Sequence, residues 1–195
     1  MRLVRQASKI EIINFADSDK HKVRYSPNVP NNIRAIVCGP SNAGKTFDLI
    51  SLLLSENSPL FLNSYLYSTT LFQDIYDYYR YVLTGIEDFG YFESPNCDDV
   101  VKLSQAKPFS VALFDDVSGE DKSVINEYFT HGRHYNQSCF FLCQCYTCSD
   151  KHAIRNNAKY LAIFRQDKLN LFNLYKNHII GYMAFKQFVD MCSFA

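Results

Sequence analysis

Short apolar runs separated by turns recur along the chain from residue 33 onward. Five of these runs have the length of buried strands and are rich in β-branched or aromatic residues, at 33–38, 64–68, 110–114, 139–143 and 160–164. Apolar residues at helical spacing predict helices over 46–54, 72–83, 98–105, 123–130 and 178–194, with a polar helix or loop over 149–158. This alternation predicts an α/β fold, in which a mostly parallel sheet carries helices on both faces.

The first 32 residues follow a different pattern. They are polar and irregular, with Ile10–Phe15 as their one apolar run and with Pro27 and Pro30 interrupting the chain. We therefore expect an N-terminal arm or strand over 1–32. The remainder, 33–195, is expected to form a single domain, because its length suits one hydrophobic core.

Membrane and redox signals both favour an intracellular protein. No run of 18 uninterrupted apolar residues occurs, so no membrane span is expected, and the first six residues lack the apolar stretch of a signal peptide. The seven cysteines are an odd number and several lie in strand-like runs, so reduced core thiols are expected. A zinc site is the alternative for one cluster, although its spacing departs from the paired Cys-x2-Cys pattern. That cluster is Cys139, Cys143, Cys145 and Cys148.

Composition narrows the functional classes. Hydrophobic residues make up 47% of the chain and aromatic residues 15%, which excludes a globally disordered protein. Lys+Arg and Asp+Glu each number 20, so the formal net charge is +0, and binding of nucleic acid by bulk charge is excluded. Contact with nucleic acid would therefore have to come from a local basic patch. One such cluster is a candidate for a DNA-contacting loop, with a solvated surface as the alternative. It consists of Lys151, His152, Arg155 and Lys159.

The most specific motif follows the first predicted strand. Residues 39–46 match G-x-x-x-x-G-K-[ST] in full, between an apolar strand and a helical run, and we call them the phosphate loop. They are Gly39, Pro40, Ser41, Asn42, Ala43, Gly44, Lys45 and Thr46. Backbone N–H groups and a helix N-terminus can face phosphates there. The motif predicts that Lys45 lies against the β- and γ-phosphates and that the Thr46 hydroxyl serves Mg²⁺.

An acidic pair ends the third predicted strand. We expect Asp115 to hold Mg²⁺ through water and Asp116 to polarise an attacking water, with Glu120 as the alternative base and loop capping as the alternative role of Asp116. The interval between Lys45 and Asp115 leaves room for an inserted strand, which favours the additional-strand class of P-loop ATPases. Residues 116–119 fit the D-x-x-G pattern of GTPases, but no Asn-Lys-x-Asp motif occurs.

Three further polar residues are candidates for contact with a γ-phosphate. Gln144 ends the fourth predicted strand, where it can hold a water, and a strand-end Gln bonded to the backbone is the alternative. Arg133 and Arg155 are candidates for an arginine that reaches the nucleotide of a neighbouring subunit, and either can instead be a surface residue. The nearby His131 and His134 are interpreted as structural.

Taken in order, these motifs resemble those of the poxvirus-type genome-packaging ATPases of the FtsK–HerA superfamily, found in large DNA viruses and virus-like transposons. The resemblance spans roughly 33–164 and rests on four motifs besides the strand that leads to Gln144. These are the phosphate loop, Leu-Phe-Asp-Asp, Gly-Arg-His-Tyr-Asn and Ile-Arg-Asn-Asn.

The resemblance implies a three-layer, RecA-like P-loop NTPase of the additional-strand class with strand order 5-1-4-3-2. It implies a homo-oligomeric ring that uses ATP and Mg²⁺ to move double-stranded DNA into a capsid, with capsid or vertex proteins as further partners at the site of virion assembly. By position, Lys45 and Thr46 match nucleotide and metal binding. Asp115 and Asp116 match the acidic pair, Gln144 matches the sensor, and Arg133 lies in the matching Gly-Arg-His segment.

Two other functions stay open at this point. The chain can be a P-loop NTPase of another class, such as a kinase or GTPase, or a nucleotide-binding scaffold without turnover. Kinases commonly use an arginine-bearing lid, which the residues near Arg165 do not provide convincingly. The acidic pair beside an intact phosphate loop argues against a non-catalytic scaffold.

Overall fold

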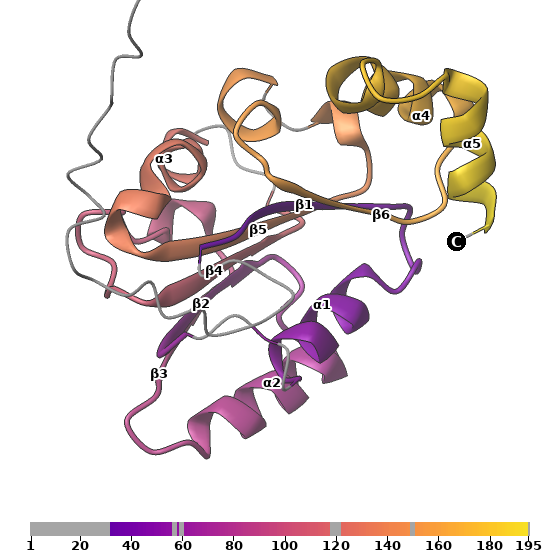
Figure 1. Ribbon diagram of the computed structural model, residues 1–195. Helices are drawn as coiled ribbons and strands as arrows, with labels where there is room; N and C mark the ends of the chain where they lie inside the picture. Colours follow the sequence, from indigo (N-terminus) through magenta and orange to yellow (C-terminus); the bar gives the residue numbers. More distant parts are fainter. Residues whose placement is uncertain (1–31, 56–57, 59–60, 118–121, 149–150, 195) are drawn as a thin grey trace, which may run out of the picture.

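Within the part of the chain that the structure describes, six parallel strands form one sheet (Figure 1). This computed structural model describes residues 32–194 except 56–57, 59–60, 118–121 and 149–150, so the predicted N-terminal arm lies outside the described residues apart from its last position. The spatial order is β3-β2-β4-β5-β1-β6. The strands are β1 (Arg34–Cys38), β2 (Asn63–Ser68), β3 (Gly90–Ser94), β4 (Ser110–Asp115), β5 (Gln137–Cys143) and β6 (Tyr160–Ile163).

The predicted fold class and strand order are confirmed, with one strand added. Numbered by themselves, the five strands found from the sequence lie in the order 5-1-4-3-2, and β3 extends the sheet beyond β2. β5 lies between β1, which leads into the phosphate loop, and β4, which ends in the acidic pair. This inserted strand is the feature expected from the interval between the two motifs.

Strand β3 was not predicted because its sequence, Gly-Tyr-Phe-Glu-Ser, has no continuous apolar run. It lies at one edge of the sheet, pairs only with β2, and its residues are half-buried or exposed. An edge strand does not need the continuous apolar run that marks a strand buried on both faces. The other edge strand, β6, is also half-exposed, but its sequence Tyr-Leu-Ala-Ile is a continuous apolar run and was therefore recognised.

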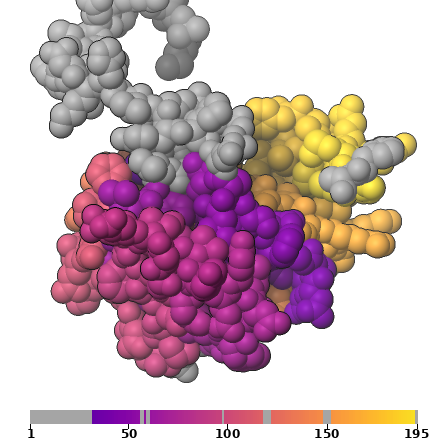
Figure 2. All heavy atoms as spheres, turned by 90° about the horizontal axis from the view of Figure 1, so that it is seen from below, coloured from indigo at the N-terminus to yellow at the C-terminus, as the bar shows by residue number. Residues whose placement is uncertain are grey.

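Helices cover both faces of the sheet. α1 (Lys45–Leu53) and α2 (Asp74–Thr84) lie on one face, while α3 (Ser123–His131) and the C-terminal helices lie on the other (Figure 1). Figure 2 looks onto the side of α1 and α2, with the last part of the chain, in yellow, standing beside them. Among the described residues, no helix combines the length and the apolar character needed to cross a bilayer.

Alternate residues of each strand serve two separate cores, because side chains of a strand point to opposite faces in turn. Val37 of β1 packs in the same cluster as Ile50 of α1, while its neighbour Ile36 packs in the cluster that contains Phe129 of α3. Every residue of β2, β4 and β5 is buried. The central strands therefore form a rigid support for the loops at their carboxyl ends.

Two helix predictions need correction. The segment predicted as a helix over 98–105 begins inside the short 3₁₀ helix η2 (Cys97–Asp99) and continues without regular structure to a turn over 103–105. Of the helix predicted over 178–194, the α-helical part is α5 (Phe185–Phe194). The polar helix or loop predicted over 149–158 contains the π-helical turn η5 (Lys151–Arg155).

The C-terminal region has more elements than its periodicity indicated. α4 (Lys168–Leu174) and the π-helical turn η6 (Tyr175–Ile179) precede α5. α4 begins where the Asp167 side chain accepts a hydrogen bond from the backbone N–H of Asn170 at 2.8 Å, which is a helix N-cap. Leu171, Leu174 and Phe188 bury this region against the core on the α3 side.

Candidate functional site

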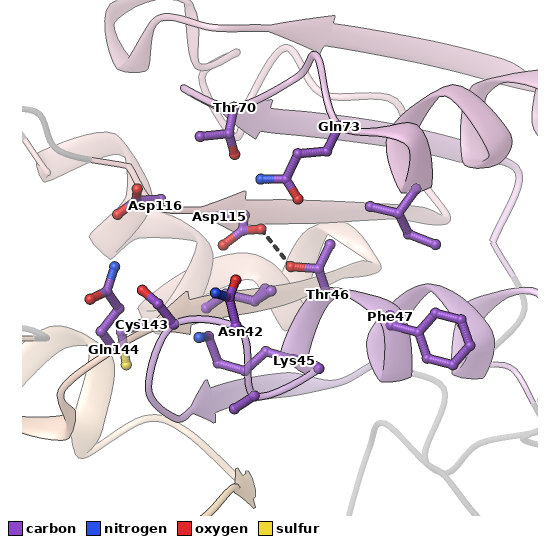
Figure 3. Close-up of a pocket in the computed structure, with 15 residues that line it drawn as sticks. Asn42, Lys45, Thr46, Phe47, Thr70, Gln73, Asp115, Asp116, Cys143 and Gln144 are labelled. Carbon is purple, nitrogen blue, oxygen red and sulfur yellow. Dashed lines mark hydrogen bonds between the residues drawn. The ribbon is translucent and has the colours of Figure 1, made fainter.

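A cavity of about 500 Å³ opens at the carboxyl ends of β1, β4 and β5 (Figure 3). Parallel strands bring their carboxyl ends to one edge of the sheet, where ligands of α/β proteins bind. The phosphate loop contributes residues 41–46, the end of β4 contributes Asp115 and Asp116, and the end of β5 contributes Cys143 and Gln144. The motifs predicted from the sequence therefore meet at one place.

The phosphate loop is held in its shape from behind. The backbone N–H of Gly39 donates to the carbonyl of Cys143 at 3.1 Å, which ties the start of the loop to the end of β5. A Cβ at Gly39 would lie 2.5 Å from Cβ of Phe164, so only glycine fits against this side chain. Gly44 adopts a φ of 91°, a conformation that favours glycine, and α1 begins at the next residue.

The Lys45 ammonium lies over the loop. Its Nζ donates to the carbonyl oxygens of Gly39 and Pro40, at 2.8 Å in each case. Both contacts are to neutral groups, so the positive charge is available to an anion in the cavity that Lys45 lines. The contact with phosphates that the motif predicts for Lys45 stays a prediction.

One carboxylate connects the phosphate loop with β4. The Thr46 hydroxyl donates to Oδ2 of Asp115 at 2.9 Å, and the Tyr76 hydroxyl of α2 donates to the same oxygen. Asp115 is 8% exposed and Tyr76 is 1% exposed. Burial, together with the neighbouring Asp115 charge, raises the pKa of Tyr76, so its hydroxyl stays protonated and acts as a donor.

This pair is suited to Mg²⁺. A hydroxyl and a carboxylate are hard oxygen donors, which Mg²⁺ prefers, and Mg²⁺ in proteins is usually held by one or two carboxylates together with substrate phosphates and water. Among the described residues there is no group of three or more His, Cys, Asp or Glu side chains that could hold a metal on its own. Thr46 and Asp115 therefore fit a cation that arrives with a nucleotide.

Asp116 and Gln144 lie on the same side of the cavity (Figure 3). Both side chains are exposed. Asp116 adopts a φ of 50°, and its carbonyl oxygen accepts a hydrogen bond from Thr69 at 3.3 Å. Non-glycine residues with positive φ are uncommon and gather at functional sites. The alternative base Glu120 lies outside the described residues.

The segment between β2 and α2 contributes a wall of the cavity that was not predicted from the sequence. Thr70 and Gln73 line the cavity there, and Figure 3 shows Gln73 on the same side as Thr70, above Asp115. Phe47 and Ile75 also line the cavity, and Phe47 is 63% exposed although it is a large aromatic residue. No motif marks these positions, because their place in the cavity depends on how α1 and α2 pack.

The two candidate arginines lie away from this cavity. Arg133 belongs to η3 (Gly132–Tyr135), which precedes β5, so it lies at the opposite edge of the sheet from Gln144. The Arg155 guanidinium stacks over the Tyr146 ring, 5.2 Å from its centroid, and the Tyr146 hydroxyl shares a hydrogen bond of 2.7 Å with Nε2 of His178. Arg155 thus packs within its own chain, while Arg133 is exposed.

The zinc alternative finds no support among the described residues. Cys139 is fully buried, and burial raises the pKa of its thiol, so the thiolate that zinc requires is disfavoured. Cys143 is buried in the same cluster. Five of the described cysteines take part in no disulfide bond, namely Cys38, Cys139, Cys143, Cys145 and Cys192.

Comparisons with known proteins agree with this geometry. The sequence profile of the poxvirus A32 protein matches residues 21–192. No curated protein sequence matches the chain significantly. Among solved structures, the genome packaging NTPase B204 from Sulfolobus turreted icosahedral virus 2 is similar in its complex with AMPPCP, with a TM-score of 0.57 and 13% sequence identity, covering 82% of this chain and 88% of that chain.

Two other complexes of B204 are also similar. The complex with AMP has a TM-score of 0.56 and 12% identity, covering 82% of this chain and 88% of that chain. The complex with ATP-γS has a TM-score of 0.53 and 11% identity, covering 82% and 87%. At such identities the likeness shows a common fold.

Proposed function

Since the chain belongs to the poxvirus A32 protein family, we propose that it hydrolyses ATP with Mg²⁺ and uses the energy to move double-stranded DNA into a capsid. The observation that carries the proposal is the hydrogen bond of 2.9 Å between Thr46 and Asp115. It joins the phosphate loop to an acid from β4, a strand that is not adjacent to β1. A triphosphate and its cation need both groups in one place.

The residues of the cavity divide the work of hydrolysis. Lys45 and the loop amides stabilise negative charge on the phosphates. Thr46 and Asp115 would hold Mg²⁺, which would supply positive charge beside the phosphates. Asp116 orients and polarises the attacking water. Gln144 contacts the γ-phosphate or that water without removing a proton.

The shape of the cavity also suits the rest of the nucleotide. Polar residues of the phosphate loop line one part of the cavity, and Phe47 lies at the end away from Gln144 (Figure 3). A nucleotide has the same division, with charged phosphates at one end and a flat apolar base at the other. Stacking of a base on Phe47 needs no specific hydrogen bond, so Phe47 favours base binding in general.

Movement of DNA requires more than one chain. Arg133 cannot reach the cavity of its own chain, since β5 separates them. We therefore assign Arg133 to the nucleotide of a neighbouring copy in a homo-oligomeric ring, where it would stabilise the charge that develops during hydrolysis. Closure of that interface would move a DNA-contacting surface, and capsid or vertex proteins would hold the ring.

Purified full-length protein tests the proposal. Turnover of ATP would be measured as released phosphate with and without duplex DNA, alongside the mass of the protein in solution. We expect DNA to increase turnover in a ring-sized species and Lys45→Ala to abolish it. A phosphorylated acceptor in place of free phosphate would indicate a kinase, and tight ATP binding without turnover would indicate a scaffold. Unchanged turnover in Lys45→Ala would refute the site.

A further inference from the structure

Helix α2 carries two fully buried tyrosines one turn apart. Tyr76 is 1% exposed and Tyr79 is 0% exposed, and both pack in the core between α2 and the sheet. The Tyr79 hydroxyl shares a hydrogen bond of 3.0 Å with Oγ of Ser64 on β2, which satisfies a buried polar group inside the core. The Tyr76 hydroxyl instead donates to Asp115.

The carboxylate of Asp115 has a second donor besides Tyr76. Oδ2 of Asp115 accepts from Thr46, in the first turn of α1, and from Tyr76, which lies on α2. Two donors from different helices fix the plane of a carboxylate better than one. Hydrogen bonds to a charged group are also stronger than those between neutral groups.

Binding of a cation would change the contacts of Thr46 but not the contact of Tyr76 with Asp115. The Thr46 hydroxyl faces the cavity, and its oxygen is the group expected to contact Mg²⁺. Tyr76 does not line the cavity and is buried behind Asp115. Its hydroxyl also interacts with the side chains of Ser68 and Thr46. Because Tyr76 does not face the cavity, its hydroxyl can hold Asp115 throughout the reaction.

We propose that Tyr76 is a positioning residue, whose hydroxyl fixes Asp115 in the orientation that serves the cation of the nucleotide complex. This inference rests on the proposed function, in which Asp115 is a ligand-side group for Mg²⁺. If so, helix α2 takes part in the metal site, because Tyr76 lies on it. Because Thr70 and Gln73 precede α2 and line the same cavity, the helix and the cavity wall are positioned together.

Tyr79 provides a matched control for the experiment. Tyr76→Phe and Tyr79→Phe each remove one buried hydroxyl from the same helix and keep the ring, so the losses in thermal stability should be similar. In the full-length chain, we expect Tyr76→Phe to raise the Mg²⁺ concentration for half-maximal ATP turnover about tenfold, because a hydrogen bond to a charged group is lost. Tyr79→Phe should stay within about twofold of the wild type.

Equilibrium binding of a fluorescent ATP analogue gives a readout that does not depend on turnover. Without Mg²⁺, we expect both variants to bind like the wild type. With Mg²⁺, the gain in affinity should be smaller in Tyr76→Phe by about tenfold and unchanged in Tyr79→Phe. In an Asp115→Asn background, Tyr76→Phe should add little, since residues that act as one unit are not additive.

Equal Mg²⁺ responses in the wild type and Tyr76→Phe would overturn the inference. Equal losses of the Mg²⁺-dependent gain in ATP affinity in both tyrosine variants, or full additivity with Asp115→Asn, would also overturn it. If the wild type binds Mg²⁺ and ATP but does not turn ATP over, the proposed function fails while the binding comparison still decides the role of Tyr76. If Tyr76→Phe does not fold, Tyr76→Met, whose flexible apolar side chain carries no donor, replaces it in each measurement.

Discussion

At the scale of single residues, a comparison of Phe47 with Phe72 distinguishes an aromatic side chain that can bind a ligand from one that is only exposed to solvent. Both are exposed aromatic side chains, at 63% and 81%, but only Phe47 lines the cavity. Figure 3 shows its ring on the far side of Thr46 from Gln144, at the end away from the acidic pair. Its position suits contact with a base and not with phosphates.

Phe47→Ala should therefore weaken ATP binding about fivefold, the loss expected when a stacking partner worth about 1 kcal/mol is removed. Competition by inorganic tripolyphosphate, which has no base, should be unchanged. Isothermal titration would measure both ligands, with Phe72→Ala as the control that binds ATP like the wild type. Equal weakening of ATP and tripolyphosphate would show that Phe47 shapes the loop instead.

Thr46→Val tests the hydroxyl that joins the loop to Asp115. Valine has nearly the same shape, so the loop should keep its fold while the hydrogen bond of 2.9 Å to Asp115 is lost. We expect turnover with Mg²⁺ to fall by two orders of magnitude or so, about the size of the loss when one transition-state contact is removed. Thr84→Val removes an exposed hydroxyl that donates to the backbone carbonyl of Arg80 at 2.8 Å, and it should leave turnover unchanged.

The sequence specified some site residues and not others for a physical reason. Lys45, Thr46 and Asp115 were predictable because the phosphate loop and a strand-end acid are local patterns. Tyr76 lies in an aromatic-rich helix in which several tyrosines have the same spacing. The packing of α2 against the sheet decides which tyrosine donates to Asp115, and this packing cannot be inferred from a local sequence pattern.

At the scale of elements, the phosphate loop depends on the segment that packs behind it. Phe164 follows β6, and its backbone N–H donates to the carbonyl of Cys38 at 2.9 Å. This hydrogen bond keeps the Phe164 side chain against Gly39. The end of β6 is thus part of the support of the loop, although it contributes no residue to the cavity.

Gly39→Ala should destabilise the protein by about 1–3 kcal/mol, the usual cost of forcing an extra methyl group into a packed site. Gly181→Ala is the matched control, because a Cβ there meets nothing within 4 Å. It should change stability by about 0.5 kcal/mol or less. Chemical denaturation of the two variants would measure the difference, and equal stabilities would mean that Phe164 moves aside without cost.

Elements with a continuous apolar run or a clear helical spacing were the predictable ones. β1, β2, β4, β5 and β6 each have an apolar run, and the residues of α1 and α2 that face the sheet recur at helical spacing. β3 and the C-terminal helices are half-exposed or short, so their patterns are weak. The cap at Asp167 was a usable signal for α4, but the apolar stripe that follows it covers only seven residues.

At the scale of the whole molecule, β5 separates two proposed catalytic groups. Gln144 follows the strand and lines the cavity, whereas Arg133 precedes it. The seven residues of β5 span roughly 20 Å at the usual rise per residue. One chain therefore cannot bring both groups to the same nucleotide, and a shared site between copies is the arrangement that uses both.

Mixing two inactive variants would reveal such a shared site. Lys45→Ala chains keep Arg133, and Arg133→Ala chains keep an intact cavity, so each is expected to be inactive alone. In an equal mixture, about a quarter of the interfaces would pair a working cavity with a working arginine, and turnover should return to that extent. A mixture that stays inactive would refute the shared site. Arg80→Ala, which removes a surface ion pair, should be active alone.

The contact between Phe164 and Gly39 also connects the edge strand β6 with the phosphate loop. If a ligand that binds the phosphate loop presses Gly39 onto Phe164, its affinity includes the energy of that packing. By thermodynamic linkage, a molecule that docks on β6 and shifts Phe164 would then alter ligand affinity, and the ligand would alter docking by the same factor.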